Sequence, residues 1–135
     1  MNINTGIQEY NLGGKVVVKF NPTDMEFGSR LNAAMTACVE REERLQKEIE
    51  GEDVIRMFEL SAAASDDIAK IIDGVFGVPV VEPLCEGVSV RAWADGMPIW
   101  ANIIMAVLDV MDASQDEAIK ASKKRVEKYT KKYGK

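Results

Sequence analysis

Two short runs near the start of the chain contain both apolar and polar residues, and the second run is rich in β-branched valine. One run covers residues 7–12, the other covers residues 15–20, and the pair Gly13-Gly14 separates them. β-branched residues favour strands, and paired glycines accept the positive φ angles of a tight hairpin turn. The pattern predicts a β-hairpin over residues 7–20, with Gly13 and Gly14 as a two-residue turn.

From residue 21 onward, apolar residues recur at steps of three, four and seven. This spacing predicts a helix with one buried face, which begins at Asn21-Pro22 or at a capping box formed by Thr23 and Glu26. Its buried stripe is predicted to contain Phe27, Leu31, Ala34, Met35, Cys38, Leu45 and Ile49. The charged run from residue 40 to residue 50 is predicted to be solvated, including Glu40, Arg41, Glu43, Arg44 and Lys47.

A second helical pattern follows Gly51, which either kinks one long helix or separates two. The pattern ends at a break formed by Gly74 and Gly77, and its apolar positions are Val54, Ile55, Phe58, Ile68, Ile71, Ile72 and Val75. Residues 76–94 lack helical periodicity and contain several Gly and Pro residues. This composition favours a loop with one short helical turn near residues 89–93.

The next pattern starts at an Asp95-Gly96 turn, after which Pro98 suits the first turn of a helix. Residues 97–111 are apolar on nearly every side, so this helix is predicted to be the most buried one. The last segment, after Ser114, is helix-prone but holds few large apolar residues. It is expected to be marginally stable on its own.

Together these elements predict one domain of residues 1–135 with a mainly α (α+β) fold. A chain of 135 residues with 47% hydrophobic residues is long enough and apolar enough to bury a single core. A short N-terminal β-hairpin over residues 1–21 is followed by about four to five helices. Residues 22–119 form the helical body, and residues 120–135 form a basic C-terminal tail or helix.

Charge is divided unevenly along this domain. Residues 120–135 hold eight of the 17 Lys and Arg residues but only one acid, Glu127, so they carry +7 in a chain of net charge −5. Residues 1–119 therefore carry −12. An abruptly basic end on an acidic chain indicates a docking segment. Its candidate contact residues are Lys123, Lys124, Arg125, Lys128, Tyr129, Lys131, Lys132 and Tyr133.

Three kinds of partner are considered for this basic segment. Nucleic acid is disfavoured because the acidic remainder of the chain repels phosphate. A membrane surface is disfavoured because Val126, Tyr129 and Tyr133 form only a thin apolar face. Protein contact fits both signs of charge, since the basic segment of one subunit can meet the acidic body of another copy or an acidic partner. Head-to-tail contacts of this kind build rings or open helical arrays.

Composition gives little support for catalytic or metal chemistry. The chain has no His, which removes the commonest general base and most zinc and iron sites. Cys38 and Cys85 lack a metal-type spacing and are expected to be buried free thiols. No enzyme activity, cofactor or metal is expected. No apolar run reaches about twenty residues and residues 1–10 do not resemble a signal peptide, so a soluble cytoplasmic protein is expected.

Two tryptophans, Trp93 and Trp100, flank the Asp95-Gly96 turn. Such a pair can offer an aromatic contact site to a partner. It can equally anchor a loop and the following helix in the core. Both interpretations stay open at the level of the sequence.

Several strings of this sequence carry a family resemblance. They are Leu12-Gly13-Gly14-Lys15, Phe20-Asn21-Pro22-Thr23-Asp24, Val75-Phe76-Gly77, Asp95-Gly96-Met97-Pro98-Ile99-Trp100-Ala101-Asn102, Leu108-Asp109-Val110-Met111-Asp112 and Lys128-Tyr129-Thr130-Lys131-Lys132-Tyr133. In this order they resemble the tail assembly chaperones of long-tailed bacteriophages and of related prophages of Gram-positive hosts. The chain departs from that family at Ile103, where Phe is frequent, and at residues 78–81, which are apolar instead of polar.

The resemblance implies a helical, non-enzymatic protein that coats the tape measure protein, keeps its long apolar helix soluble and recruits tail tube subunits. It also implies a spiral or ring-like homo-oligomer that is absent from the mature virion. The partner-binding residues expected around the turn are Trp93, Asp95, Pro98, Trp100 and Asn102. The alternatives are a virion structural or connector protein and a small nucleic-acid-binding regulator.

Overall fold

The computed structural model describes residues 1–114 and 117–133, with the backbone alone at residues 117, 118 and 133. The described residues form five helices and two short antiparallel hairpins, which confirms the predicted mainly α fold with an N-terminal β-hairpin. In chain order the elements are β1 (Gln8–Leu12), β2 (Val16–Phe20), α1 (Met25–Glu48), α2 (Val54–Phe76), α3 (Val81–Cys85), β3 (Trp93–Ala94), β4 (Met97–Pro98), α4 (Ile99–Asp112) and α5 (Glu117–Tyr133).

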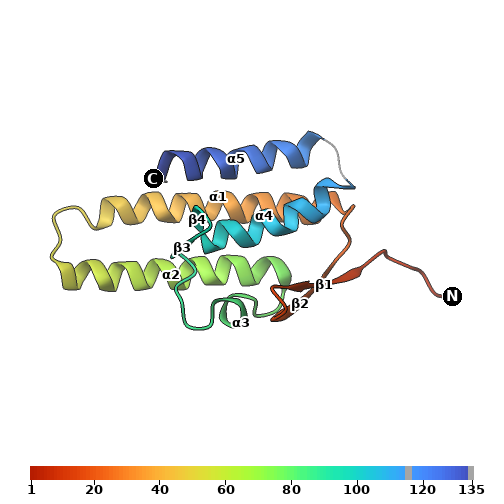
Figure 1. Ribbon diagram of the computed structural model, residues 1–135, viewed down its shortest axis with the longest axis horizontal. Helices are drawn as coiled ribbons and strands as arrows, with labels where there is room; N and C mark the ends of the chain where they lie inside the picture. The colour runs from red at the N-terminus through yellow and green to blue at the C-terminus, as the bar shows by residue number, and fades with distance from the viewer. Residues whose placement is uncertain (115–116, 134–135) are drawn as a thin grey trace.

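Helix α1 is central to the arrangement. It runs antiparallel to α2, and α4 and α5 also pack against it (Figure 1). The β1–β2 hairpin and α3 lie near one end of the α1–α2 pair, and the first residues of the chain extend away from the body. At the other end, the connection between α1 and α2 extends past α4 and α5.

The β1–β2 hairpin has a three-residue connection instead of the predicted two-residue turn. The Lys15 N–H donates to the Leu12 carbonyl at 3.0 Å, and Leu12 is opposite Val16. In this register Tyr10 is opposite Val18, so even-numbered residues of both strands share the face toward the core. A two-residue turn would pair even with odd positions and would turn part of the apolar set toward water. Burial of the apolar face therefore selects the longer connection.

Helix α1 begins later than either predicted cap. Asp24 is the N-cap, and its carboxylate accepts a hydrogen bond from the Glu26 N–H at 3.0 Å. The Asn21 side chain instead accepts from the Thr23 N–H at 2.8 Å and donates to the Thr5 carbonyl at 2.8 Å. A side chain that closes its own turn is not available to the helix. The predicted stripe is confirmed for Phe27, Leu31, Ala34, Met35, Cys38 and Leu45, which are all buried.

Gly51 separates two helices, which resolves the alternative left open by the sequence. It has a φ of +74°, a left-handed conformation that favours glycine. Two residues later Asp53 caps α2, and its carboxylate accepts a hydrogen bond from the Arg56 N–H at 2.8 Å. The positive φ reverses the chain, and the cap starts the second helix.

The loop after α2 contains its short helix at a different place from the prediction. The helix is α3, whereas residues 89–93 contain turns and the start of β3. The Asp73 carboxylate, near the end of α2, accepts hydrogen bonds from the N–H groups of Val80 and Val81 at 2.7 and 3.0 Å. This acceptor supports the first turn of α3. At residues 89–93, where the helical turn was predicted, the Val90 carbonyl accepts a hydrogen bond from the Trp100 N–H of α4 at 2.9 Å.

Helices α4 and α5 complete the core. As predicted, α4 is the most buried helix, with seven of its 14 residues buried against nine of 24 in α1. Helix α5 is not a detached tail, because Ile119, Val126 and Tyr129 are buried in the same core. Residues 120–133 of the basic segment therefore belong to a helix of the body. Tertiary packing supplies the stability that its own sequence does not.

The charged run of α1 is not uniformly solvated, and the prediction that Arg41 stays in water is wrong. The Arg41 side chain is buried, and it donates to Asp67 of α2 at 2.8 Å and to Glu48 at 3.0 Å. The hydrogen bond from Arg41 lowers the pKa of Asp67. Position 41 lies three residues after Cys38 and four before Leu45, which places it at the edge of the buried stripe.

Both cysteines are expected to resist alkylation in the folded protein. Cys38 is fully buried, and burial raises the pKa of its thiol to about 12, with the charge of Glu42 adding to the shift. Burial also raises the pKa of Cys85. Because the thiolate is the reactive form, iodoacetamide should label neither residue in the native protein and both in urea, as read by peptide mass spectrometry. Rapid labelling of Cys38 without denaturant would contradict this burial.

Candidate functional site

The predicted Asp95-Gly96 turn is confirmed, and it connects two very short strands. Ala94 of β3 is opposite Met97 of β4, and the two residues between them have φ angles of +55° and +82°. Positive φ at both positions is the turn geometry that Asp-Gly favours. The Asn102 side-chain amide donates to the Ala94 carbonyl at 2.8 Å, so this hairpin is fixed to α4.

The five partner residues predicted around this turn divide between surface and core. Trp93 is 44% exposed, Asp95 is exposed, and Asn102 is half-buried. Pro98 and Trp100 are buried, so they have no surface to offer a partner. The structure corrects the prediction for these two residues: Trp100 is a core anchor, and only Trp93 remains available as an aromatic contact.

A buried carboxylate lies at the junction of three helices and a loop. Glu42 of α1 is 8% exposed, although the sequence placed it in the solvated run. The Arg91 Nε donates to its Oε1 at 2.5 Å. Its Oε2 lies 3.5 Å from the Trp100 Nε1 of α4 and 3.5 Å from the Tyr129 hydroxyl of α5. One carboxylate therefore contacts the loop before β3 and both C-terminal helices.

The guanidinium of Arg91 extends this junction to α2. Its Nη1 donates to the Ser61 hydroxyl at 2.6 Å. Glu42, Gln46, Arg91, Trp93 and Tyr129 also line a small pocket of about 160 Å³ beside the junction. The ion pair is largely removed from water, with side chains 16% and 10% exposed. Such a pair is expensive to break because removing one partner leaves the other buried and unpaired.

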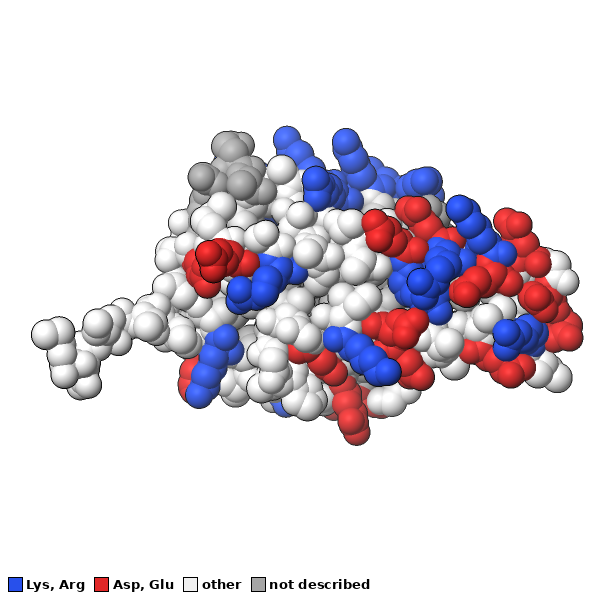
Figure 2. Space-filling view, turned by 180° about the vertical axis from the view of Figure 1, so that it is seen from behind, with Lys and Arg blue, Asp and Glu red and all other residues white. Residues whose placement is uncertain are grey.

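The basic residues of α5 lie mainly on its outer side (Figure 2). Lys123 is an exception, since it contacts Asp109 at 2.7 Å and Asp112 at 3.3 Å on α4, and the hydrogen bond to Asp109 raises its pKa. Lys123 therefore connects α5 to α4 and is not part of the exposed basic surface. The side chain of Tyr133 lies outside the described residues, and Tyr129 is buried. The exposed members of the predicted set are Lys124, Arg125, Lys128, Lys131 and Lys132.

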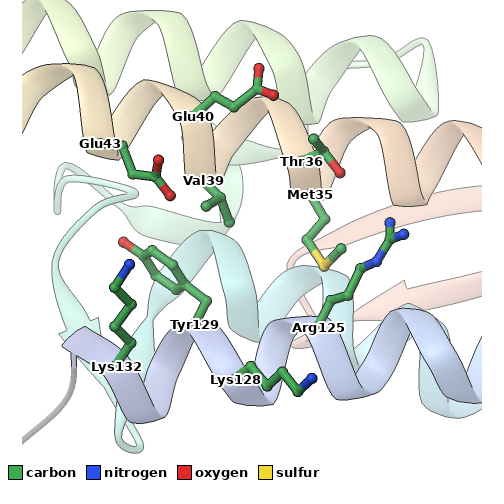
Figure 3. Close-up of a pocket in the computed structure, with 9 residues that line it drawn as sticks. All are labelled: Met35, Thr36, Val39, Glu40, Glu43, Arg125, Lys128, Tyr129 and Lys132. Atoms are coloured by element: carbon green, nitrogen blue, oxygen red, sulfur yellow. The ribbon is translucent and has the colours of Figure 1, made fainter.

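A groove between α1 and α5 gathers four of the predicted partner residues (Figure 3). We call it the α1–α5 groove; it has a volume of about 530 Å³ and is lined by Met35, Thr36, Val39, Glu40, Glu43, Arg125, Lys128, Tyr129 and Lys132. Its apolar lining consists of the half-buried Val39 and the buried residues Met35 and Tyr129. The two Glu residues come from α1, and the three basic residues come from α5. The groove thus has an apolar floor between an acidic and a basic side.

The start of α2 carries an exposed apolar surface that the sequence did not separate from the core. Val54, Ile55 and Phe58 are 60, 73 and 69% exposed, and we call them the α2 tip. The buried residues of the same helix are Ala64, Ile68 and Ile72, farther along the chain. One helical pattern therefore contains a core stripe and a surface stripe. Large exposed apolar residues in a cluster are typical of interaction surfaces.

No protein-family model, curated protein or solved structure matches the chain. Within residues 1–114 and 117–133, no group of three or more His, Cys, Asp and Glu residues is arranged to hold a metal ion. None of the described helices is both long enough and apolar enough to cross a membrane. The candidate binding surfaces of the described residues are the α1–α5 groove, the α2 tip and the surface around Trp93.

Substitution of Glu42 is expected to destabilise the protein much more than the same change at its neighbour. Glu42→Gln removes the charge that pairs with Arg91 in a nearly buried site, which should lower the free energy of unfolding by about 3 kcal/mol. Glu43→Gln changes an exposed residue and should stay within about 0.5 kcal/mol of the native value. Urea unfolding followed by circular dichroism measures both. Equal midpoints for the two variants would show that the junction does not hold the helices together.

Proposed function

We propose that this protein is a tail assembly chaperone of a long-tailed bacteriophage or prophage. It acts without catalysis, by reversible binding to the tape measure protein, and it recruits tail tube subunits and associates with copies of itself. It works in the cytoplasm of the host cell and is absent from the mature virion. The proposal is supported by the sequence strings that resemble this family and by the surfaces of the helical body.

The observation that carries the proposal is the α1–α5 groove. An apolar floor between charged sides is suited to an amphipathic helix, which can lay its apolar face in the groove and its charged residues along the sides. Met35 and Val39 supply the floor from α1, and Tyr129 supplies it from α5. A long helical partner could carry one copy of the protein on each such segment, which is how a chaperone coats an apolar helix.

A nucleic-acid-binding regulator is the alternative that the basic outer side of α5 favours. Phosphate binding requires a surface on which basic residues are not opposed by acids. Glu40 and Glu43 line the α1 side of the groove, opposite the α5 side that carries Lys128, and both are exposed. The acidic side beside the basic one suits an amphipathic helix better than a phosphate backbone.

Co-expression with the tape measure protein tests the proposal. The native chain should keep the tape measure protein in the soluble fraction, and Thr36→Arg should abolish this effect because it places a bulky cation in the groove. Thr36 is exposed, so the variant should fold as the native protein does. Ser29→Arg, two turns earlier on the same helix, introduces the same side chain outside the groove and should remain active. An insoluble tape measure protein beside the native chain would overturn the proposal.

A chaperone and a virion component differ in where the protein is found after assembly. The chaperone proposal predicts that the chain is abundant in infected or induced cells and absent from purified virions. Quantitative mass spectrometry of the two samples makes this comparison, with the tail tube protein as the internal reference. A stoichiometric amount of the chain in virions would assign it to the virion structural or connector class.

A further inference from the structure

The α2 tip is placed to contact another molecule. Val54, Ile55 and Phe58 belong to the first two turns of α2, directly after the connection with α1. That connection extends past α4 and α5, so neither helix covers it (Figure 1). The spacing of three and four residues places the side chains on one stripe of the helix. Such a stripe resembles the apolar face with which an amphipathic helix binds in a groove.

Charges around the α2 tip are mainly acidic. Glu52, Asp53 and Glu59 flank the stripe, and Arg56 is the cation among them. Arg56 lies 3.9 Å from Glu59, with both side chains more than half exposed. In the view from behind, acidic side chains with a few basic ones gather at this end of the molecule, whereas basic ones follow α5 (Figure 2). The tip is therefore an apolar stripe with an acidic surround.

The α1–α5 groove has complementary features. Its floor is apolar, and the exposed residues Arg125 and Lys128 provide positive charge on one side. Lys124 and Lys131 extend this basic surface beyond the groove, and neither they nor Lys128 make an ion pair with any described residue. The acidic residues on the α1 side of the groove can receive a cation such as Arg56. The groove thus matches the α2 tip in apolar character and in both signs of charge.

We propose that the α2 tip of one copy docks in the α1–α5 groove of a second copy. The inference develops the self-association included in the proposed function by assigning its two surfaces. Pairing two identical tips would bring two acidic surrounds together, and pairing two identical α5 faces would bring two basic surfaces together. Like charges oppose both of these arrangements, whereas the tip-to-groove contact joins opposite charges. The contact is therefore heterologous.

A heterologous contact leaves one tip and one groove unoccupied at the ends of every open assembly. Further copies can add at both ends, so the contact produces a ring when its rotation closes and an open helical chain when it does not. The same groove is the proposed site for the tape measure helix. A bound helix and a neighbouring copy therefore compete, and binding of the helix releases the tip that occupied the groove.

Sedimentation velocity of single variants gives the first test. The native chain should form assemblies larger than a dimer as its concentration rises. Phe58→Asp removes the largest apolar side chain of the tip and should weaken self-association at least about tenfold, the effect of losing one buried apolar side chain. Thr36→Arg places a bulky cation in the groove and should block the same contact. Both positions are exposed, and circular dichroism verifies that the helices remain. Met25→Asp, an exposed apolar position at the far end of α1, is the matched control for Phe58→Asp and should associate like the native chain.

Mixing the two variants distinguishes a heterologous contact from every two-fold arrangement. The Phe58→Asp copy keeps a working groove, and the Thr36→Arg copy keeps a working tip. An equimolar mixture should form a heterodimer and nothing larger, because only one productive contact remains. Recovery of no complex, or of large assemblies, would overturn the assignment of the two surfaces, as would a native chain that stays monomeric.

The sedimentation experiments and the co-expression experiment test different hypotheses, the self-contact and the chaperone function. If the tape measure protein stays insoluble while the tip and groove variants behave as expected, the chaperone function is wrong and the self-contact stands. If Phe58→Asp self-associates normally while Thr36→Arg loses the tape measure protein, the self-contact is wrong and the chaperone function stands.

Discussion

The arrangement of the helices depends on the buried carboxylate of Glu42. A buried carboxylate is stable only when charged partners and hydrogen bonds replace the water that it has lost. Arg91 supplies the charge, and Trp100 and Tyr129 place their donors near the second oxygen. Because these partners come from a loop, α4 and α5, the requirement fixes all three relative to α1. Helix α5 has few large apolar residues, so this polar contact helps to set its position and hence the shape of the α1–α5 groove.

Periodicity was sufficient to predict the long helices, because burial of one face of a helix places apolar residues three or four positions apart. It was not sufficient for features that depend on one side chain meeting a distant backbone. The position of α3 follows from Asp73, which accepts hydrogen bonds from Val80 and Val81. The start of α1 follows from Asn21, whose side chain closes its own turn and leaves the cap to Asp24. Neither choice has a counterpart in the spacing of apolar residues.

The candidate site was predicted in part, and its errors have a common physical origin. Composition made residues 40–50 appear solvated, but helical position decides which of them face inward. Glu42 lies four residues after Cys38 and three before Leu45, so it lies on the buried stripe. In α2, Phe58 belongs to the same apolar pattern as the buried Ile68 and Ile72, although it lies on the surface. Periodicity identifies a stripe, but only the neighbouring elements decide whether that stripe is covered.

An exposed apolar surface such as the α2 tip promotes aggregation unless neighbouring charges restrict its contacts. Acidic residues around the α2 tip disfavour the approach of a second tip and favour the approach of a basic surface. The same charges therefore limit indiscriminate apolar association and would orient the proposed contact with the α1–α5 groove. Both effects depend on exposed charges, whose interactions are screened within about 8 Å at physiological salt. In the proposed contact, the apolar stripe supplies affinity at short range, and the charge pattern selects which surfaces come within that range.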